Sequence, residues 1–324
     1  MKIAINGLGR IGRAALKVAM ERPEVEVTAV NDLADLETLK YLLKYDSVYG
    51  KFDRADELGS SIKVLCEKDP EKLPWADLGV DVVIESTGFF ADKIGAMKHL
   101  TAGAKKVIIS ANSKDADLSA VMGVNNAQYN PLEHTIIANC SCTTNCAAPV
   151  MKVLNDNFAV RKAYMTTVHA VTSTQNLVDG PNDKLRRGRA AFASIIPTST
   201  GAAEAVVRVL PELKGRITGA AFRVPVLCGS VLEVVAHIAK ETSAEKINEI
   251  FKKASEENFK GIVEVNSEGL VSADIPGTTA SAIVDLPLTE VIGDFVRVVA
   301  WYDNEYAYAM RLIDLVEFIN LRGV

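Results

Sequence analysis

The chain has 324 residues, about twice the length of a typical domain, so we expect two domains. Its net charge of -5 comes without a block of like charges, which argues against a nucleic-acid partner and against binding to an anionic membrane. No apolar run is long enough to span a membrane and the first residues lack a signal-peptide pattern, so we expect a cytoplasmic protein. Five cysteines, an odd number, favour reduced thiols over a disulfide framework.

The chain begins with a pattern that is typical of a dinucleotide-binding unit. An apolar strand over residues 2–6 ends at Gly7, where Gly7, Gly9 and Gly12 form a G-x-G-x-x-G turn before a helical pattern. A second strand ends at Asp32, which follows Gly12 at the distance that places an acid on a ribose. Glycines in this turn let a pyrophosphate approach the helix N-terminus. The alternative is an ordinary strand-to-helix turn whose glycines serve packing alone.

The pattern of predicted strands and helices changes along the chain. Up to about residue 140, short apolar strands alternate with helices, which predicts a doubly wound parallel sheet of the Rossmann type. After about residue 160, longer alternating runs predict a mostly antiparallel second sheet with helices on one face, hence an α/β protein with a second, α+β domain. The expected elements of this second part are strands over residues 164–172, 220–225, 230–239 and 295–302, and helices over residues 201–209, 244–255 and 306–321.

Three of the five cysteines lie in NCSCTTNC, residues 139–146. Cys142 directly precedes a run with helical spacing, and a helix N-terminus favours a thiolate nucleophile. Cys140 and Cys146 are interpreted as small buried apolar residues. The remaining cysteines and the histidines are scattered, so we expect no metal site. His169, in a polar part of a predicted strand, is the candidate base, although from pattern alone a satisfied core histidine is the more common case.

One arginine lies inside an apolar segment, where a charged side chain needs a partner of opposite charge. Arg223 lies inside the apolar strand AAFRVP, and a charge in such a place favours a bound anion. Arg187 belongs to a short cluster of arginines whose alternative interpretation is a solvated loop.

The motifs INGLGRIGR, ESTGFF, SCTTNC, TTVHAVT, DGPNDKLRRGRAA, IIPTSTGAA, AFRVP and WYDNEY together resemble phosphorylating glyceraldehyde-3-phosphate dehydrogenase, in the order of that family and over nearly the whole chain. Erythrose-4-phosphate dehydrogenase shares the cysteine motif, but Thr172 disfavours it. A nucleotide-binding redox-sensing paralogue is the other alternative. The intact pair of Cys142 and His169 argues against a protein that has lost its activity.

The resemblance implies an oxidoreductase of glycolysis or gluconeogenesis that uses NAD, glyceraldehyde 3-phosphate and inorganic phosphate, works as a homotetramer, and binds neither nucleic acid nor membranes. It implies a dinucleotide-binding domain over residues 1–141, completed by the helix over residues 305–324, and a catalytic domain over residues 142–304. Cys142 would be the nucleophile and His169 the base. The residues implied for the substrate phosphate are Thr172 and Arg223, and those for the attacking phosphate are Ser141, Thr143, Arg187, Thr200 and Gly201. The residues implied for the cofactor are Gly7, Gly9, Arg10, Ile11, Gly12, Asp32, Lys68, Ser110, Asn304 and Tyr308.

Overall fold

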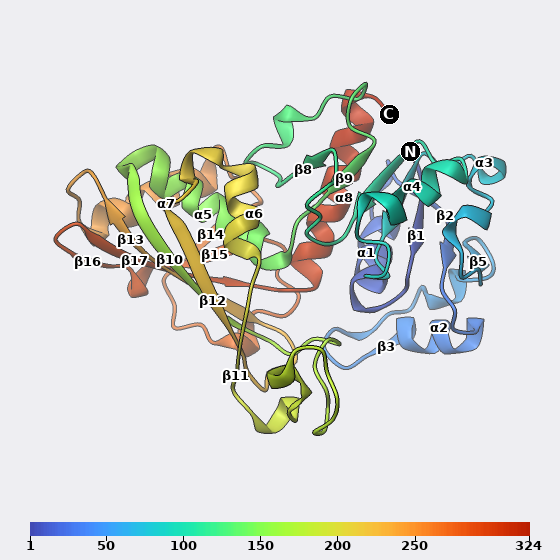
Figure 1. Cartoon of the computed structure of the whole chain (residues 1–324), viewed down its shortest axis with the longest axis horizontal. Coiled ribbons are helices and arrows are strands. Elements are labelled where there is room, and N and C mark those ends of the chain that lie inside the picture. Colours follow the sequence, from blue (N-terminus) through green and yellow to red (C-terminus); the bar gives the residue numbers. More distant parts are fainter. The chain divides into compact units, whose positions relative to one another are not determined.

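Short runs of Val, Ile and Ala form the first sheet, because such strands can be buried on both faces by helices. In the computed structural model, which describes all 324 residues, seven strands lie in the order β5-β2-β1-β6-β7-β9-β8, and every neighbouring pair is parallel (Figure 1). The predicted doubly wound parallel sheet is therefore confirmed. Its strands are β1 (Lys2–Asn6), β2 (Glu26–Asn31), β5 (Lys63–Leu65), β6 (Val82–Glu85), β7 (Lys106–Ile109), β8 (Leu118–Ser119) and β9 (Ile136–Ala138).

Helices connect β1 to β2, β2 to β5, β5 to β6 and β6 to β7, as the alternating pattern predicted. These helices are α1 (Arg10–Met20), α2 (Leu36–Lys44), α3 (Trp75–Leu78) and α4 (Lys93–Thr101), and a small hairpin of β3 (Tyr45–Asp46) and β4 (Gly50–Lys51) follows α2. The last helix of the chain is α8 (Tyr306–Arg322). The turn into α1 depends on two glycines. Gly7 has a φ of +92°, and a Cβ on Gly12 would lie 1.9 Å from the Gly7 carbonyl oxygen. A side chain at either position would push α1 away from β1.

The second sheet is mixed and mostly antiparallel, also as predicted. Its strand order is β11-β12-β10-β13-β17-β15-β14, with β16 paired to β17, and only the pairs β10/β12 and β14/β15 are parallel. The strands are β10 (Val160–His169), β11 (Ile196–Thr198), β12 (Ile217–Arg223), β13 (Ser230–Ile238), β14 (Val263–Asn266), β15 (Ala282–Asp285), β16 (Glu290–Ile292) and β17 (Phe295–Tyr302).

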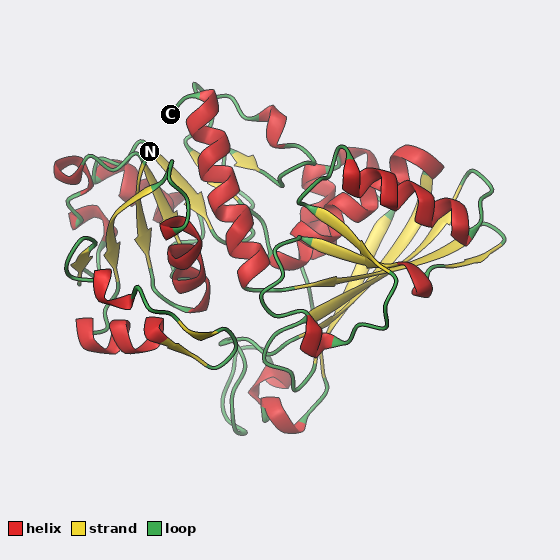
Figure 2. Cartoon of the chain, turned by 180° about the vertical axis from the view of Figure 1, so that it is seen from behind, coloured by secondary structure: helices red, strands yellow, loops and turns green.

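Three helices pack on this sheet: α5 (Cys142–Phe158), α6 (Ala202–Val209) and α7 (Ala244–Glu256). Helix α5 lies against β10, β13, β15 and β17, while α6 contacts β12 and α7 contacts β14. Figure 2 shows these helices along one face of the sheet. The arrangement places the N-terminus of α5 at the end of the sheet where β10 and β12 finish.

The chain separates into two units of internal contacts. The first contains Met1–Met122, Asn126–Ser141 and Tyr308–Val324, and the second contains Gly123–Asn125 and Cys142–Ala307. Each unit carries one of the two sheets. None of the helices combines the length and the hydropathy needed to cross a membrane.

Candidate active site

A cysteine and a histidine meet at the end of the second sheet. Cys142 is the first residue of α5, and His169 is the last residue of β10. The Cys142 Sγ lies 3.4 Å from the His169 Nε2, which is hydrogen-bonding distance for sulfur. His169 is buried, and it ends its strand, whereas the sequence pattern had placed it mid-strand in a run to Thr172. The two side chains that the sequence proposed as nucleophile and base are thus in contact.

The sheet register brings a cation to the other side of the histidine. Strands β10 and β12 are parallel, and His169 is the register partner of Arg223. The Arg223 Nη1 lies 2.6 Å from the His169 Nδ1 and donates to the Ala170 carbonyl oxygen at 2.9 Å. The His169 Nδ1 is also 2.7 Å from that carbonyl oxygen. A proton on Nδ1 would be donated to Ala170 and would leave the Nε2 lone pair facing Cys142, whereas a hydrogen bond from Arg223 to Nδ1 requires the proton on Nε2.

Burial dominates the protonation of this pair. It lowers the pKa of His169 to about 3, and the positive charge of Arg223 acts in the same direction. Burial also raises the pKa of the Cys142 thiol, against the opposing effects of the Arg223 charge and of the Thr143 backbone N–H. Both shifts favour a thiol beside a neutral imidazole over a thiolate–imidazolium pair. The thiolate predicted from the helix N-terminus stays a prediction: burial opposes it, while the Arg223 charge and the Thr143 N–H favour it.

Two arginines without acidic partners lie in this unit. No carboxylate pairs with Arg187 or Arg223, and the buried Nε of Arg223 has no hydrogen-bond partner. Arg187 donates from Nε to the Thr198 hydroxyl at 3.0 Å and from Nη1 to the Thr174 hydroxyl at 3.2 Å. Thr174 in turn shares a hydrogen bond with Thr172 at 2.9 Å. Cations that lack a carboxylate are suited to hold an anion.

The other predicted phosphate ligands lie at helix N-termini. Thr143 is in the first turn of α5, and Ser141 immediately precedes that helix in the sequence. Gly201 is the N-cap residue of α6, and the Thr200 hydroxyl accepts a hydrogen bond from the Ala202 N–H at 3.1 Å. Backbone N–H groups at such helix ends favour anions.

A buried tyrosine supports the catalytic pair and was not singled out in the sequence. The Tyr302 hydroxyl lies 2.9 Å from the Thr143 Oγ1 and 2.7 Å from the Thr167 Oγ1. Its ring meets the His169 ring edge-on, with centroids 6.0 Å apart. Burial raises the pKa of Tyr302, so the hydroxyl stays protonated. Tyr302 therefore fixes Thr143 and packs against the ring of His169.

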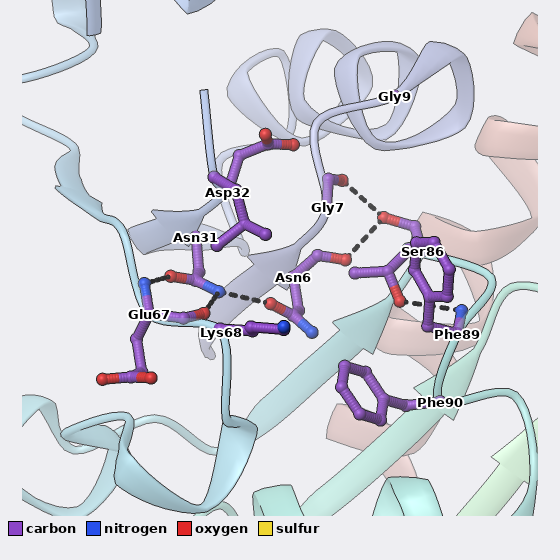
Figure 3. A pocket seen from close by; sticks show the side chains of 12 residues that line it. Asn6, Gly7, Gly9, Asn31, Asp32, Glu67, Lys68, Ser86, Phe89 and Phe90 are labelled. Atoms are coloured by element: carbon purple, nitrogen blue, oxygen red, sulfur yellow. Dashed lines mark hydrogen bonds between the residues drawn. The ribbon is translucent and has the colours of Figure 1, made fainter. Parts of the chain in front are cut away.

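A cavity of about 550 Å³ opens at the carboxyl ends of the strands of the first sheet. Its lining residues are Asn6, Gly7, Gly9, Asn31, Asp32, Leu33, Glu67, Lys68, Ser86, Thr87, Phe89 and Phe90 (Figure 3). Asp32 accepts hydrogen bonds from the Leu8 N–H at 2.7 Å and from the Ala34 N–H at 3.0 Å, so it does not cap α2, whose N-cap is Asp35. A Cβ added to Gly9 would meet no atom within 4 Å, which leaves room for a ligand against the turn.

The floor of this cavity rests on a chain of buried side-chain amides and acids. The Asn31 side-chain NH₂ donates to the Asn6 Oδ1 at 2.7 Å and to the Glu67 carbonyl oxygen (Figure 3). The Asn31 Oδ1 accepts a hydrogen bond from the Glu67 backbone N–H. Asn6 donates to Glu85 at 2.6 Å, and the Glu85 carboxylate is also 3.1 Å from the His99 Nε2. His99 is fully buried and belongs to this network.

The remaining cofactor candidates occupy varied surroundings. Arg10 and Ile11 begin α1, whose N-cap Gly9 supplies no side-chain hydrogen bond, and Arg10 pairs with Asp46 at 2.6 Å. Ser110 directly follows β7. The Tyr308 hydroxyl donates to the Cys140 carbonyl oxygen at 2.8 Å. Asn304, in the second unit, is buried with its Oδ1 2.8 Å from the Ser230 hydroxyl.

Comparison with known proteins decides the family. The model described as the NAD binding domain of glyceraldehyde 3-phosphate dehydrogenase matches residues 1–93, and the model of the C-terminal domain matches residues 141–304. The chain belongs to the glyceraldehyde-3-phosphate dehydrogenase family. A relative of that name from Geobacillus stearothermophilus is 50% identical over 333 residues, with 100% of this chain and 99% of the relative covered. Glyceraldehyde-3-phosphate dehydrogenase 1 of Bacillus subtilis is 48% identical (100% and 99% covered), and glyceraldehyde-3-phosphate dehydrogenase 2 of Trichormus variabilis is 48% identical (98% of each).

Membership in the glyceraldehyde-3-phosphate dehydrogenase family confirms the resemblance drawn from the motifs, the α/β class, and NAD as the cofactor. The chain is an NAD-dependent oxidoreductase. The roles of its individual residues are predictions, which we argue from the contacts of those residues.

Proposed function

We propose that this chain oxidises D-glyceraldehyde 3-phosphate, with NAD and inorganic phosphate, to 1,3-bisphosphoglycerate, and that Cys142 and His169 carry out the chemistry. The observation that supports this most directly is the 3.4 Å contact between the Cys142 Sγ and the His169 Nε2 beside two unpaired arginines. A nucleophile and a base in contact, with cations nearby, are suited to covalent catalysis on a phosphorylated aldehyde.

The first step is the addition of sulfur to the aldehyde carbon. The neutral His169 takes the thiol proton through Nε2 as the Sγ–carbon bond forms, and the imidazolium gives this proton to the carbonyl oxygen, which yields a hemithioacetal and a neutral imidazole. The resting imidazole holds no proton, but its lowered pKa also makes it a weak base, so it takes up the thiol proton more readily once a substrate phosphate offsets the Arg223 charge. A thioester then forms when the hemithioacetal hydroxyl gives its proton to the imidazole. NAD, when bound, supplies the hydride acceptor for this oxidation.

Inorganic phosphate completes the reaction. One of its oxygens attacks the thioester carbon, the carbon–sulfur bond breaks, and the Cys142 thiolate leaves with the acyl phosphate as the other product. The thiolate then recovers a proton from the imidazolium of His169. The backbone N–H of Cys142 and the imidazolium would stabilise the oxyanion of both tetrahedral intermediates.

Arg223 would link substrate binding to the state of the base. Its Nη1 lies 2.6 Å from the His169 Nδ1, and its charge helps to keep the pKa of His169 low. A substrate phosphate bound by Arg223 would offset that charge and compete for its N–H groups. The His169 Nδ1 would then donate to the Ala170 carbonyl oxygen, which leaves the Nε2 lone pair directed at Cys142.

The residues of the first unit fit NAD. The turn that contains Gly7, Gly9 and Gly12 would receive the pyrophosphate beside Arg10 and Ile11, while Asp32 would bind the ribose and Lys68 would lie near the adenine. We propose nicotinamide-binding roles for Ser110 and Tyr308 of this unit, and for Asn304 of the second unit. The cavity beside Gly9 and its acidic wall at Asp32 support this assignment.

Substitution of the two arginines should affect the KM values of two different substrates. Arg223→Met is expected to raise the KM for glyceraldehyde 3-phosphate by about ten- to a hundredfold, and Arg187→Met to raise the KM for inorganic phosphate by a similar factor, since each loses charge-assisted hydrogen bonds. Steady-state kinetics with each substrate varied in turn measures both effects. If both variants raised the KM of one and the same substrate, the assignment of the two arginines to separate anion sites would be contradicted.

We expect NAD to be preferred over NADP. The 2′-phosphate of NADP would face the Asp32 carboxylate, and like charges about 4 Å apart cost roughly 1 kcal/mol in water and about 4 kcal/mol at an effective dielectric of 20. Even the smaller value favours NAD several-fold in kcat/KM. Asp32→Asn should reduce this preference. Asp35→Asn is the control, because the Asp35 side chain accepts from the Thr38 N–H outside the wall of the cavity.

The proposed activity has a simple test. Purified protein should reduce NAD when given glyceraldehyde 3-phosphate and phosphate together, and arsenate should replace phosphate because it can also attack a thioester. We further propose that the dinucleotide-binding domain is residues 1–141 with residues 305–324, that residues 142–304 form the catalytic domain, and that the enzyme is a cytoplasmic homotetramer. Erythrose 4-phosphate oxidised more efficiently than glyceraldehyde 3-phosphate would overturn the substrate assignment.

A further inference from the structure

One buried hydroxyl in the second unit bonds to two parts of the proposed active site. Ser230, the first residue of β13, is fully buried. Its Oγ lies 3.1 Å from the Ala170 N–H and 2.8 Å from the Asn304 Oδ1. The Ala170 N–H can only donate, so the single hydroxyl proton of Ser230 goes to Asn304. This fixes the Asn304 amide with its oxygen toward Ser230 and its NH₂ group directed elsewhere.

The other partner leads to the base. The peptide unit of Ala170 bonds through its N–H to Ser230, and its carbonyl oxygen lies 2.7 Å from the His169 Nδ1. The same carbonyl oxygen accepts from Arg223. The orientation of the His169 ring, and with it the contact of Nε2 with Cys142, therefore depends on how firmly the Ala170 residue is held.

We propose that Ser230 is a positioning residue that holds the imidazole of His169 and the amide of Asn304 in one fixed relation. The inference rests on the roles proposed above for those two residues. With its oxygen bound to Ser230, Asn304 offers only N–H donors to a ligand, so it would bind the carbonyl oxygen of a nicotinamide carboxamide. The same hydroxyl keeps the Ala170 carbonyl where it can accept the Nδ1 proton, which prepares Nε2 to act as a base.

Removing this hydroxyl leaves two buried polar groups without their partner. In Ser230→Ala, the Ala170 N–H and the Asn304 Oδ1 both lose a hydrogen bond, and a buried group in that state moves to find another partner. The amide of Asn304 is then free to turn, and the Ala170 peptide can tilt about the flanking backbone hydrogen bonds that His169 and Val171 keep with Val224 and Val226. A purely structural serine would affect stability instead, without a selective effect on the reaction.

The chain offers a matched control for that distinction. Ser281 is also a buried serine of the second unit, but its hydroxyl has no hydrogen-bond partner. Ser281→Ala also removes a buried hydroxyl oxygen, but it breaks no hydrogen bond. Comparison of the two variants therefore isolates the effect of the two hydrogen bonds of Ser230.

Two measurements test the proposal. In the enzyme without cofactor, Ser230→Ala should slow the alkylation of Cys142 by iodoacetamide at pH 7 about threefold or more, because the base is misaligned. In the complete reaction it should lower kcat by about ten- to a hundredfold, with the KM for glyceraldehyde 3-phosphate changed less than about threefold. Ser281→Ala should leave both values at those of the wild type.

A double-mutant cycle tests the link to Asn304. If Ser230 acts partly through Asn304, the loss in affinity for NAD in Ser230→Ala/Asn304→Ala should be smaller than the product of the two single losses, as calorimetric titration can measure. Unchanged alkylation and kcat in Ser230→Ala, or affinity losses that multiply fully, would overturn the proposal. Ser230→Cys keeps a weak donor at the same position and replaces the alanine variant if that does not fold.

These experiments distinguish an error in the role of Ser230 from an error in the proposed catalytic pair. If Cys142→Ser or His169→Asn retained full turnover, the assignment of the catalytic pair would fall, and Ser230 would have nothing to position. If both variants are impaired and Ser230→Ala matches the wild type, the catalytic pair stands and the positioning role alone is wrong.

Discussion

Replacing Cys142 with serine is expected to lower turnover by about a thousandfold or more, a loss of at least about 4 kcal/mol in transition-state stabilisation. Serine would have to attack as a much weaker acid, with only the neutral His169 to remove its proton. An ester in place of the thioester would also be less reactive toward phosphate. The turnover of purified Cys142→Ser, corrected for trace wild-type enzyme, measures the effect.

The neighbouring cysteines provide the controls. Cys140 and Cys146 are both fully buried, and burial raises the pKa of the Cys146 thiol well above its usual value. Cys140→Ser and Cys146→Ser should therefore keep most of the turnover of each folded molecule, although each places a hydroxyl in the core. Equal loss of turnover in all three variants would remove the special role of Cys142.

The dinucleotide-binding part of the fold was predictable because its signals are local. A strand, three glycines, a helix and an acid follow one another within the first 32 residues. Each has a local physical reason: Gly7 adopts a positive φ, and Gly12 lies against the Gly7 carbonyl oxygen. Asp32 then lies at the wall of the cavity because the strands β1 and β2 are neighbours.

The end of β10 was harder to predict because contacts from distant residues determine it. The sequence pattern carried the strand to Thr172, but the structure ends it at His169. Beyond that point the Ala170 N–H bonds to Ser230 and the Thr172 N–H bonds to the side chain of Gln175. The hydrogen bond to Ser230, sixty residues away, leaves no periodic signal in the sequence.

Several supporting residues of the site were missed for a similar reason. Thr174, Thr198, Ser230 and Tyr302 are ordinary strand or loop residues by type, and only their hydrogen bonds connect them with the site. A weak signal existed for Tyr302, which ends an apolar strand at the start of the polar segment WYDNEY. The effect of burial on the pKa values of Cys142 and His169 left no local signal either, because burial is a property of the folded chain.

The second large effect is expected for His169→Asn, which should lower turnover by about a hundred- to ten-thousandfold, the range for loss of a general base. Asparagine keeps polar atoms near Cys142 but cannot accept a proton. The affinity for NAD should stay within about twofold of the wild type, since the residues proposed to bind the cofactor are unchanged. Turnover and calorimetric titration with NAD give the two values.

Alkylation of Cys142 by iodoacetamide reports on the same pair without the full reaction. Because burial raises the pKa of the Cys142 thiol, the thiolate fraction is small at pH 7, and the wild-type rate should rise with pH across the neutral range. His169→Asn should be slower at every neutral pH, because no neighbouring base shares the proton. His237→Asn is the control, since His237 pairs with Asp294 at the surface and should react like the wild type. An alkylation rate in His169→Asn equal to that of the wild type would mean that the 3.4 Å contact does not activate the thiol.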